Sequence, residues 1–269
     1  LRLAFGAHGF PLDGLPFLPP GLEFDDGELT VEGLVEGSLD EPRIQGTGKL
    51  IAERVIYDEA GVELTDLDLR FAADPREVRL LQLAARLGEG RLSGDGVFEY
   101  ADNQHADFQL SGDGLEFRNL ADLFTGTCDL DVRFVSDEAG PRLNGRVEVI
   151  QGNIDVIMGG GVAVGKRTPP GKTAEAPLDV NLEIVAERNL WVRSEMIDLE
   201  VSANLKLTLL GEELALGGRL NTVRGSVYFL DKAFDIDEGT IAFGRRIPPD
   251  PDLNIRDRKS TRLNSSHYS

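Results

Sequence analysis

The residues that could do chemistry are few in this chain, and the most suggestive group is a glycine-rich segment that ends in lysine. Residues 160–166 (GGVAVGK) spell most of a phosphate-binding loop. Arg167 stands where a magnesium-holding Ser or Thr would follow, and Pro169 and Pro170 exclude the helix whose amino terminus would hold the phosphate. We therefore interpret the segment as an exposed loop rather than as a nucleotide site.

The histidines and the cysteine offer no local site either. His8, His105 and His267 lie too far apart in the sequence to supply a metal pair by local spacing. The single cysteine, Cys128, can form neither an internal disulfide nor a Cys-based zinc site, and we expect it to be a small buried side chain. The sequence therefore predicts no metal, no cofactor and no enzymatic activity.

Acidic residues that precede glycine could belong to calcium-binding loops. Asp-Gly occurs at 26–27, 95–96 and 113–114, but none of these pairs belongs to a D-x-[DN]-x-[DN]-G loop. We expect these pairs, together with Glu238-Gly239, to be turns between strands. The other carboxylates could include a glycosidase pair in space, but the sequence gives no means of choosing two of them.

The charge balance excludes one class of partner. The chain has 269 residues, with 28 Lys and Arg against 47 Asp and Glu, for a formal net charge of −19. A protein that neutralises phosphates carries the opposite charge, so no nucleic acid is expected as a partner.

The elements that must position any site are strands. Residues 199–209 (LEVSANLKLTL) alternate apolar and polar side chains without a break, and alternation of this kind is typical of a strand with one wet face. Shorter runs repeat the pattern throughout. Twelve apolar positions from the three clearest runs are the candidate lining of an apolar surface: Leu130, Val132, Phe134, Val180, Leu182, Ile184, Leu199, Val201, Ala203, Leu205, Leu207 and Leu209.

The spacing of turn signals predicts an all-β sheet of about eighteen strands, roughly 85 Å long at ~4.8 Å per strand. A helix is an alternative for residues 78–87 (VRLLQLAARL), and a helix of one or two turns is an alternative near 119–124. The same alternation could also fill the closed core of a sandwich or barrel.

The sequence contains internal echoes and one stretch without periodicity. Residues 143–154 (LNGRVEVIQGNI) resemble residues 216–227 (LGGRLNTVRGSV) at an offset of 73, and LSGDG occurs at both 92–96 and 110–114. We divide the chain into a β-segment over 1–157, a flexible Gly- and Pro-rich insertion over 158–177, a second β-segment over 178–256, and a tail over 257–269.

The tail does not fit the rest of the sequence. Residues 257–267 (DRKSTRLNSSH) read as the in-frame translation of a widely used DNA-sequencing adapter, and they turn basic and Ser-rich after an acidic stretch. We set the tail aside as a non-native segment and expect the authentic sequence to be cut off at about Arg256.

A longer stretch resembles a known family. From Asn189-Leu190-Trp191-Val192 the chain continues through an alternating strand to the segments RGSVYF, DEGTIAF and PDLNI. This order resembles the carboxy-terminal region of the TamB family, the inner-membrane subunit of the bacterial translocation and assembly module. The resemblance covers residues 189–255 closely and residues 28–155 more loosely.

The resemblance implies a long twisted sheet, mostly antiparallel or mixed, that curls into an open trough with an apolar interior. It implies a periplasmic protein that is anchored in the inner membrane and acts in outer-membrane biogenesis. Its implied partners are phospholipid and an outer-membrane Omp85-type barrel protein, TamA-like or BamA. Three functions stay open: carriage of phospholipid chains, assistance to the assembly of barrel proteins, and a ligand-free structural repeat. The second would use strand addition at a bare sheet edge.

Overall fold

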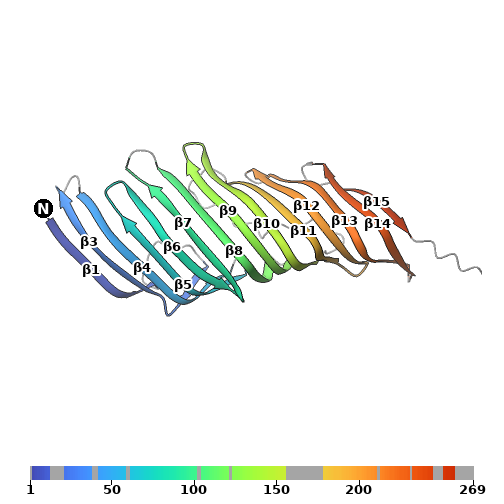
Figure 1. The fold of residues 1–269 in the computed structure, drawn as a ribbon, viewed down its shortest axis with the longest axis horizontal. Coiled ribbons are helices and arrows are strands. Elements are labelled where there is room, and N and C mark those ends of the chain that lie inside the picture. Colours follow the sequence, from blue (N-terminus) through green and yellow to red (C-terminus); the bar gives the residue numbers. More distant parts are fainter. Residues whose placement is uncertain are drawn as a thin grey trace, which may run out of the picture.

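The computed structural model describes residues 2–12, 21–37, 42–58, 61–101, 104–120, 123–155, 178–210, 213–230, 232–244 and 251–257. These residues form one sheet of fifteen strands, and none of them lies in an α-helix. The sheet is long and curved, and the first and last strands lie at its opposite ends (Figure 1). An open trough, as predicted, is therefore the architecture, and the alternatives of a closed barrel and of a two-sheet sandwich are wrong for this part of the chain.

The strands are mostly longer than the turn signals suggested, which is why the described residues hold fifteen strands rather than about eighteen. Their bounds are β1 Arg2–Pro11, β2 Leu22–Asp25, β3 Glu28–Gly37, β4 Pro42–Tyr57, β5 Val62–Ala73, β6 Glu77–Leu87, β7 Gly90–Glu99, β8 His105–Leu120, β9 Phe124–Asp137, β10 Gly140–Asp155, β11 Asp179–Arg193, β12 Ile197–Leu210, β13 Glu213–Phe229, β14 Lys232–Gly244 and β15 Pro251–Asp257.

Neighbours in the sequence are almost always neighbours in the sheet. The order is β1-β3-β4 and then consecutively to β15, with β2 paired to the far end of β4. Every pair is antiparallel except β10 and β11, which run parallel. The ends of the strands form two rims. We call the rim that carries the turn between β9 and β10 the first rim, and the rim that carries the turn between β6 and β7 the second rim.

Bulges bend the strands. Extra residues interrupt the register at Asp113-Gly114 in β8, at Ile150 in β10, at 187–189 in β11 and at Val223 in β13. An inserted residue bends its strand and increases the local twist. From β8 to β13 these interruptions fall at nearly the same level of adjacent strands, and they form a crease along which the sheet folds.

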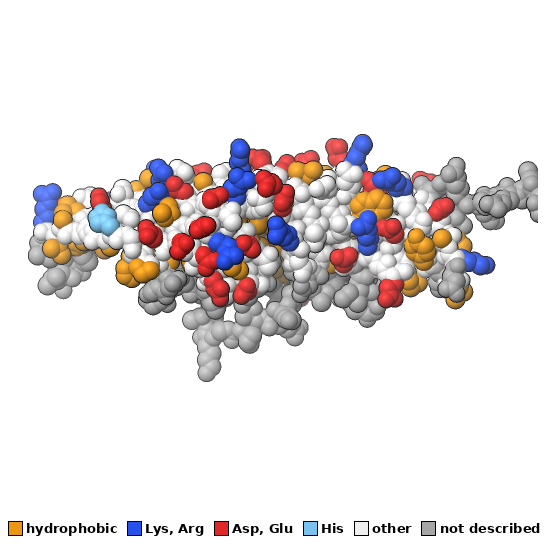
Figure 2. Space-filling model, turned by 90° about the horizontal axis from the view of Figure 1, so that it is seen from below, with side chains coloured by type: hydrophobic (Ala, Val, Ile, Leu, Met, Phe, Trp, Pro, Cys, Tyr) orange, Lys and Arg blue, Asp and Glu red, His pale blue; other side chains and the backbone are white. Residues whose placement is uncertain are grey.

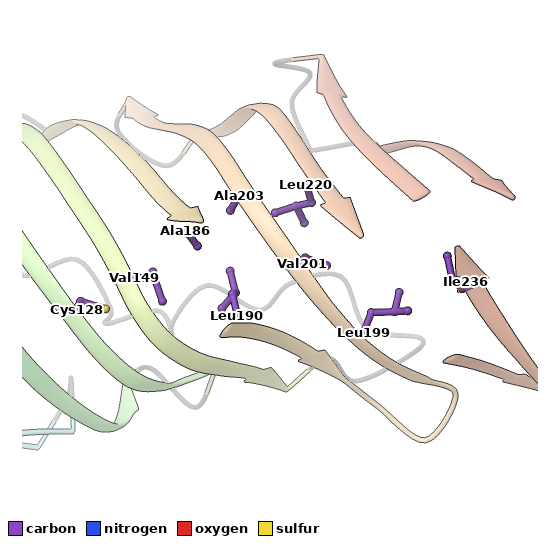
Figure 3. Close-up of a cluster of buried hydrophobic side chains, with 9 residues drawn as sticks. All are labelled: Cys128, Val149, Ala186, Leu190, Leu199, Val201, Ala203, Leu220 and Ile236. Atoms are coloured by element: carbon purple, nitrogen blue, oxygen red, sulfur yellow. The ribbon is translucent and has the colours of Figure 1, made fainter. Parts of the chain in front are cut away.

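The main buried cluster lies along the inside of this crease. Its members come from β9 to β14, and Figure 3 shows them on the concave side of the bend. Val201 and Ala186 are each 1% exposed although they belong to a single-layered sheet. The nine members are Cys128, Val149, Ala186, Leu190, Leu199, Val201, Ala203, Leu220 and Ile236. A smaller cluster of Ala52, Val55, Leu67 and Ala85 lies in β4 to β6.

The structure corrects two alternatives and one expectation drawn from the sequence. Residues 78–87 lie in β6 and are not helical. The bulge at Leu81-Gln82 shifts the alternation by one residue, and the shifted pattern imitates the spacing of a helix. No helix forms at Asn119, Leu120, Leu123 or Phe124, the described residues of the second helical candidate.

The third correction concerns the acidic residue–glycine pairs. Asp26-Gly27 is a turn, but Asp95-Gly96 and Glu238-Gly239 lie inside β7 and β14, and Asp113-Gly114 is the bulge of β8. At Gly96 a β-carbon would come within 2.4 Å of the ring of Phe108. Glycine is required there by close packing between strands rather than by a turn.

Candidate functional site: the apolar wall of the trough

The concave face between the crease and the first rim carries continuous rows of apolar side chains. Residues that are directly opposite one another in adjacent strands lie on the same face of a sheet, so the register defines each row. The first row crosses twelve strands, from β1 to β13, and holds only apolar side chains and glycine. Its members are Phe10, Leu29, Leu50, Leu69, Leu83, Gly94, Leu110, Val132, Gly145, Leu182, Leu207 and Leu216.

A second row runs beside the first, nearer to the first rim. It crosses the same strands and again contains no polar side chain. Its members are Ala7, Val31, Gly48, Phe71, Leu80, Gly96, Phe108, Phe134, Leu143, Val180, Leu209 and Leu214.

A third row lies on the side of the crease and spans β7 to β14. Its members are Leu92, Gly112, Leu130, Val147, Ile184, Leu205, Gly218 and Phe243. We call the three rows together the apolar wall. At ~4.8 Å per strand, the two longer rows extend for about 50 Å.

The register brings nine of the twelve candidate residues from the sequence into this wall, three in each row. The remaining three, Leu199, Val201 and Ala203, continue along β12 into the cluster at the crease, where their side chains are buried. Val180 is also buried, at 9% exposed. The other eight candidates are half-buried, and they are the ones that a ligand in the trough could touch.

Apart from Phe134, the aromatic side chains of the wall were not predicted from the sequence. Phe71 and Phe108 in the second row each face a glycine of the neighbouring strand. A β-carbon on Gly48 would lie 2.1 Å from the ring of Phe71, so the ring covers the bare backbone of that glycine. At Gly96 the signal was present as a glycine inside an apolar strand, but Asp95-Gly96 was predicted to be a turn.

The opposite, convex face is charged. Figure 2, in which the molecule is seen from below, shows Lys and Arg side chains interspersed with Asp and Glu along its length. Many of the charges pair across strands, as Arg133 does with Asp107, and Arg146 Nη1 lies 3.0 Å from a carboxylate oxygen of Glu183. The hydrogen bond from Arg133 lowers the pKa of Asp107. The polar side chains of the alternating strands therefore lie on this face.

One carboxylate on the convex face is buried. Glu200 is 3% exposed, accepts a hydrogen bond of 2.9 Å from the backbone N–H of Asn189, and accepts another from the guanidinium of Arg224. The backbone hydrogen bond, supported by that from Arg224, lowers the pKa of Glu200. Asn189 belongs to the bulge of β11 and has a φ of 63°, so Glu200 fixes the bulge that helps to make the crease.

The candidate residues for chemistry lie apart from one another in the described sheet. Cys128 is 2% exposed, and burial raises the pKa of its thiol to about 12. In the part of the chain that the structure describes, no group of three or more His, Cys, Asp or Glu residues could hold a metal ion. His8 lies on β1 and His105 begins β8, while the glycine-rich segment 160–166 and His267 lie outside the described residues.

The geometry is therefore that of a continuous, half-buried apolar surface. No helix within the described ranges has the length and hydropathy needed to cross a membrane. In the described sheet, no second layer of strands lies over the apolar wall. An apolar surface of this length that is only half-buried is typical of a site for an apolar ligand or partner.

Comparison with known proteins gives one result. A family model described as the TamB C-terminal domain matches residues 81–268, a range that covers more than half of the chain and runs on through the basic tail. No curated protein and no solved structure matches the chain.

Proposed function

Because this chain belongs to the family of TamB C-terminal domains, which acts in outer-membrane biogenesis, we propose that its trough carries the acyl chains of phospholipid between the inner and outer membranes. The continuity of the apolar wall supports the proposal: two rows cross twelve strands without one polar side chain. TamB domains are periplasmic parts of membrane-anchored proteins, and the family works with TamA-type partners.

The physical reason for such a surface is the cost of exposing hydrocarbon to water. That cost is about 0.8 kcal/mol per CH₂, or on the order of 20 kcal/mol for two long chains. A chain that lies along the rows can exchange one Leu, Val or Phe for the next without leaving apolar contact. Because the rows are continuous from strand to strand, apolar contact is kept while the ligand slides.

The two faces of one strand provide the test. Leu207 lies in the first row and is half-buried, and Thr208 follows it on the convex face. We expect Leu207→Glu to lower the amount of co-purifying phospholipid several-fold, measured by mass spectrometry of the extracted protein, and Thr208→Glu to leave it unchanged. Circular dichroism of both variants would show that the sheet is intact. Absence of lipid from the unaltered protein, or equal lipid in the two variants, would contradict the proposal.

We propose as the second candidate function that the same sheet helps an Omp85-type barrel protein of the outer membrane to assemble. Among the described strands, β1 and β15 each have a neighbour on one side only, and such an edge can accept an added strand. Cross-linking from Asp252 or Asn254 of β15 to a TamA-type barrel would support this function. Cross-links that form equally well from convex positions such as Glu148 would count against it.

A further inference from the structure

We propose that the trough prefers phospholipids whose head group carries an amine, such as phosphatidylethanolamine, over phospholipids with a net negative head group. The inference rests on the proposed function and adds the class of lipid. It comes from the charges at the two rims and from the position of the apolar wall between them.

The apolar wall ends close to the first rim. One step beyond the second row, Val78, Phe98 and Ala106 face one another across β6, β7 and β8, and Phe98 is 38% exposed. The strand ends follow directly. A lipid whose chains lie against the second row therefore has its head group beside the first rim.

The first rim is acidic. Among the described residues that lie within one residue of its strand ends, the basic ones are Arg2, Arg43 and Arg76, and carboxylates outnumber them. The acidic side chains there include Glu36, Asp74, Glu99, Glu138, Asp179 and Glu213. Glu99 and Glu138 contribute to a hollow of about 770 Å³ that Arg76, Glu77, Asp137 and His105 also line. Glu77 and Asp137 are paired with Arg79 and Arg142, whereas Glu99 and Glu138 are exposed at the rim.

The second rim is more balanced. Its strand ends bring Arg86, Arg91, Arg193 and Lys232 next to acidic residues such as Asp58 and Asp155. The three rows of the wall contain no basic side chain, so the residues of the wall do not offset the charge of a phosphate. An ammonium group can face the acidic first rim while the phosphate points away from it, an arrangement that a net anionic head group cannot match.

The size of the effect follows from screening. The Debye length is about 8 Å at physiological ionic strength, so a head group beside the rim interacts with several carboxylates at once. Charges at such distances in a high-dielectric setting give a preference of roughly three- to tenfold, which high salt removes.

The experiment uses the whole chain and vesicles of phosphatidylethanolamine and phosphatidylglycerol in equal amounts with the same acyl chains. The protein is incubated with the vesicles at low and at high salt and then separated from them. The amounts of the two lipids bound to the protein are quantified by mass spectrometry. We expect the anionic lipid to be under-represented about three- to tenfold at low salt and to approach its share in the vesicles at high salt.

Matched variants locate the cause. Glu99→Lys with Glu138→Lys changes the first rim, and Asp95→Lys with Glu148→Lys makes the same change of charge at exposed mid-strand positions on the convex face. We expect the rim variant to raise the share of anionic lipid and the convex variant to leave it unchanged, with total lipid similar in both. Bound lipid that mirrors the vesicles at all salt concentrations, or that shifts equally in both variants, would overturn this inference alone. Absence of bound lipid of either kind would overturn the proposed function, and this inference with it.

Discussion

The amino-terminal half of the sheet, β1 to β7, and the carboxy-terminal half, β8 to β14, share the same apolar rows but differ in how deeply they bury them. The carboxy-terminal half holds the nine-residue cluster at the crease, whereas the buried cluster of the amino-terminal half has four members. Large apolar side chains of the concave face are exposed in the amino-terminal half, with Leu3 at 56% and Phe10 at 42%.

The cause of the difference is the alignment of the bulges. In the carboxy-terminal half the bulges of β8, β10, β11 and β13 fall at nearly the same level. The strands therefore bend together and bury the side chains on the inside of the crease. In the amino-terminal half the bulge at Asp66 in β5 and the bulge at Leu81-Gln82 in β6 lie at different levels. Alternation of apolar and polar residues is therefore enough to make one face of the sheet apolar. Aligned bulges determine whether the side chains of that face become buried in a core or stay accessible as an open wall.

The largest test of this comparison is a charge placed in each half. Val201→Asp buries a carboxylate at a site that is 1% exposed, and we expect a loss of about 4 kcal/mol of unfolding free energy. Leu50→Asp in the amino-terminal half has a half-buried site and should cost about 1–2 kcal/mol. Urea unfolding followed by circular dichroism measures both. Equal losses would mean that the two halves are buried alike.

Within the carboxy-terminal half, glycines differ in what a β-carbon would meet. A β-carbon on Gly145 would come within 2.3 Å of the backbone oxygen of Asp131, which cannot move without disturbing the sheet, and we expect Gly145→Ala to cost about 2–3 kcal/mol. At Gly112 the nearest atoms belong to the end of the Leu115 side chain, which is buried but can shift more readily than a backbone oxygen, so Gly112→Ala should cost less, about 1–2 kcal/mol. Gly244→Ala, with open space around it, serves as the control in thermal unfolding. A larger loss at Gly112 than at Gly145 would contradict this account.

The buried carboxylate gives a smaller, pH-dependent effect. The pKa of Glu200 is lowered in the folded state, so its stabilisation is present above the ordinary pKa of a glutamate and is lost as the pH falls through the lower, folded value. We expect Glu200→Gln to cost about 1–2 kcal/mol at neutral pH and the difference from the unaltered protein to shrink in acid. Unfolding in urea at a series of pH values measures it.

The matching change in the amino-terminal half is Asp68→Asn. The hydrogen bond from Arg70 lowers the pKa of Asp68, but the pair lies at the surface and should contribute at most about 1 kcal/mol. A difference between Glu200→Gln and the unaltered protein that grows toward acid pH would show that the sign of the linkage is wrong.

The smallest expected effect lies on the convex face, where the halves should behave alike. Leu81 and Val223 are the exposed residues of two bulges, at 54% and 47%. We expect Leu81→Ser and Val223→Ser each to change the unfolding free energy by no more than about 0.5 kcal/mol. A clear loss at Val223 alone would show that the crease depends on that side chain and not only on the extra residue.

The sequence predicted the faces of the strands well and the interruptions poorly. The period of two in residues 199–209 placed Leu205 and Leu207 on the concave face, because tertiary context adds little to so regular a pattern. The bulges were missed, since one extra residue in β6 converts alternation into a spacing that resembles a helix. Gly96 and Gly145 are required by close approach of the next strand, a distance that a single sequence does not contain.

The single parallel pair, β10 with β11, has a consequence for the direction of the strands that follow it. In a sheet whose strands are all antiparallel to their neighbours, strands three places apart run in opposite directions. The parallel step restores the direction, so β10 and β13 point the same way and both place an extra residue two positions before a glycine, at Ile150 and Val223. The two similar segments, 143–154 and 216–227, therefore lie in strands of the same direction and turn the same apolar positions toward the trough.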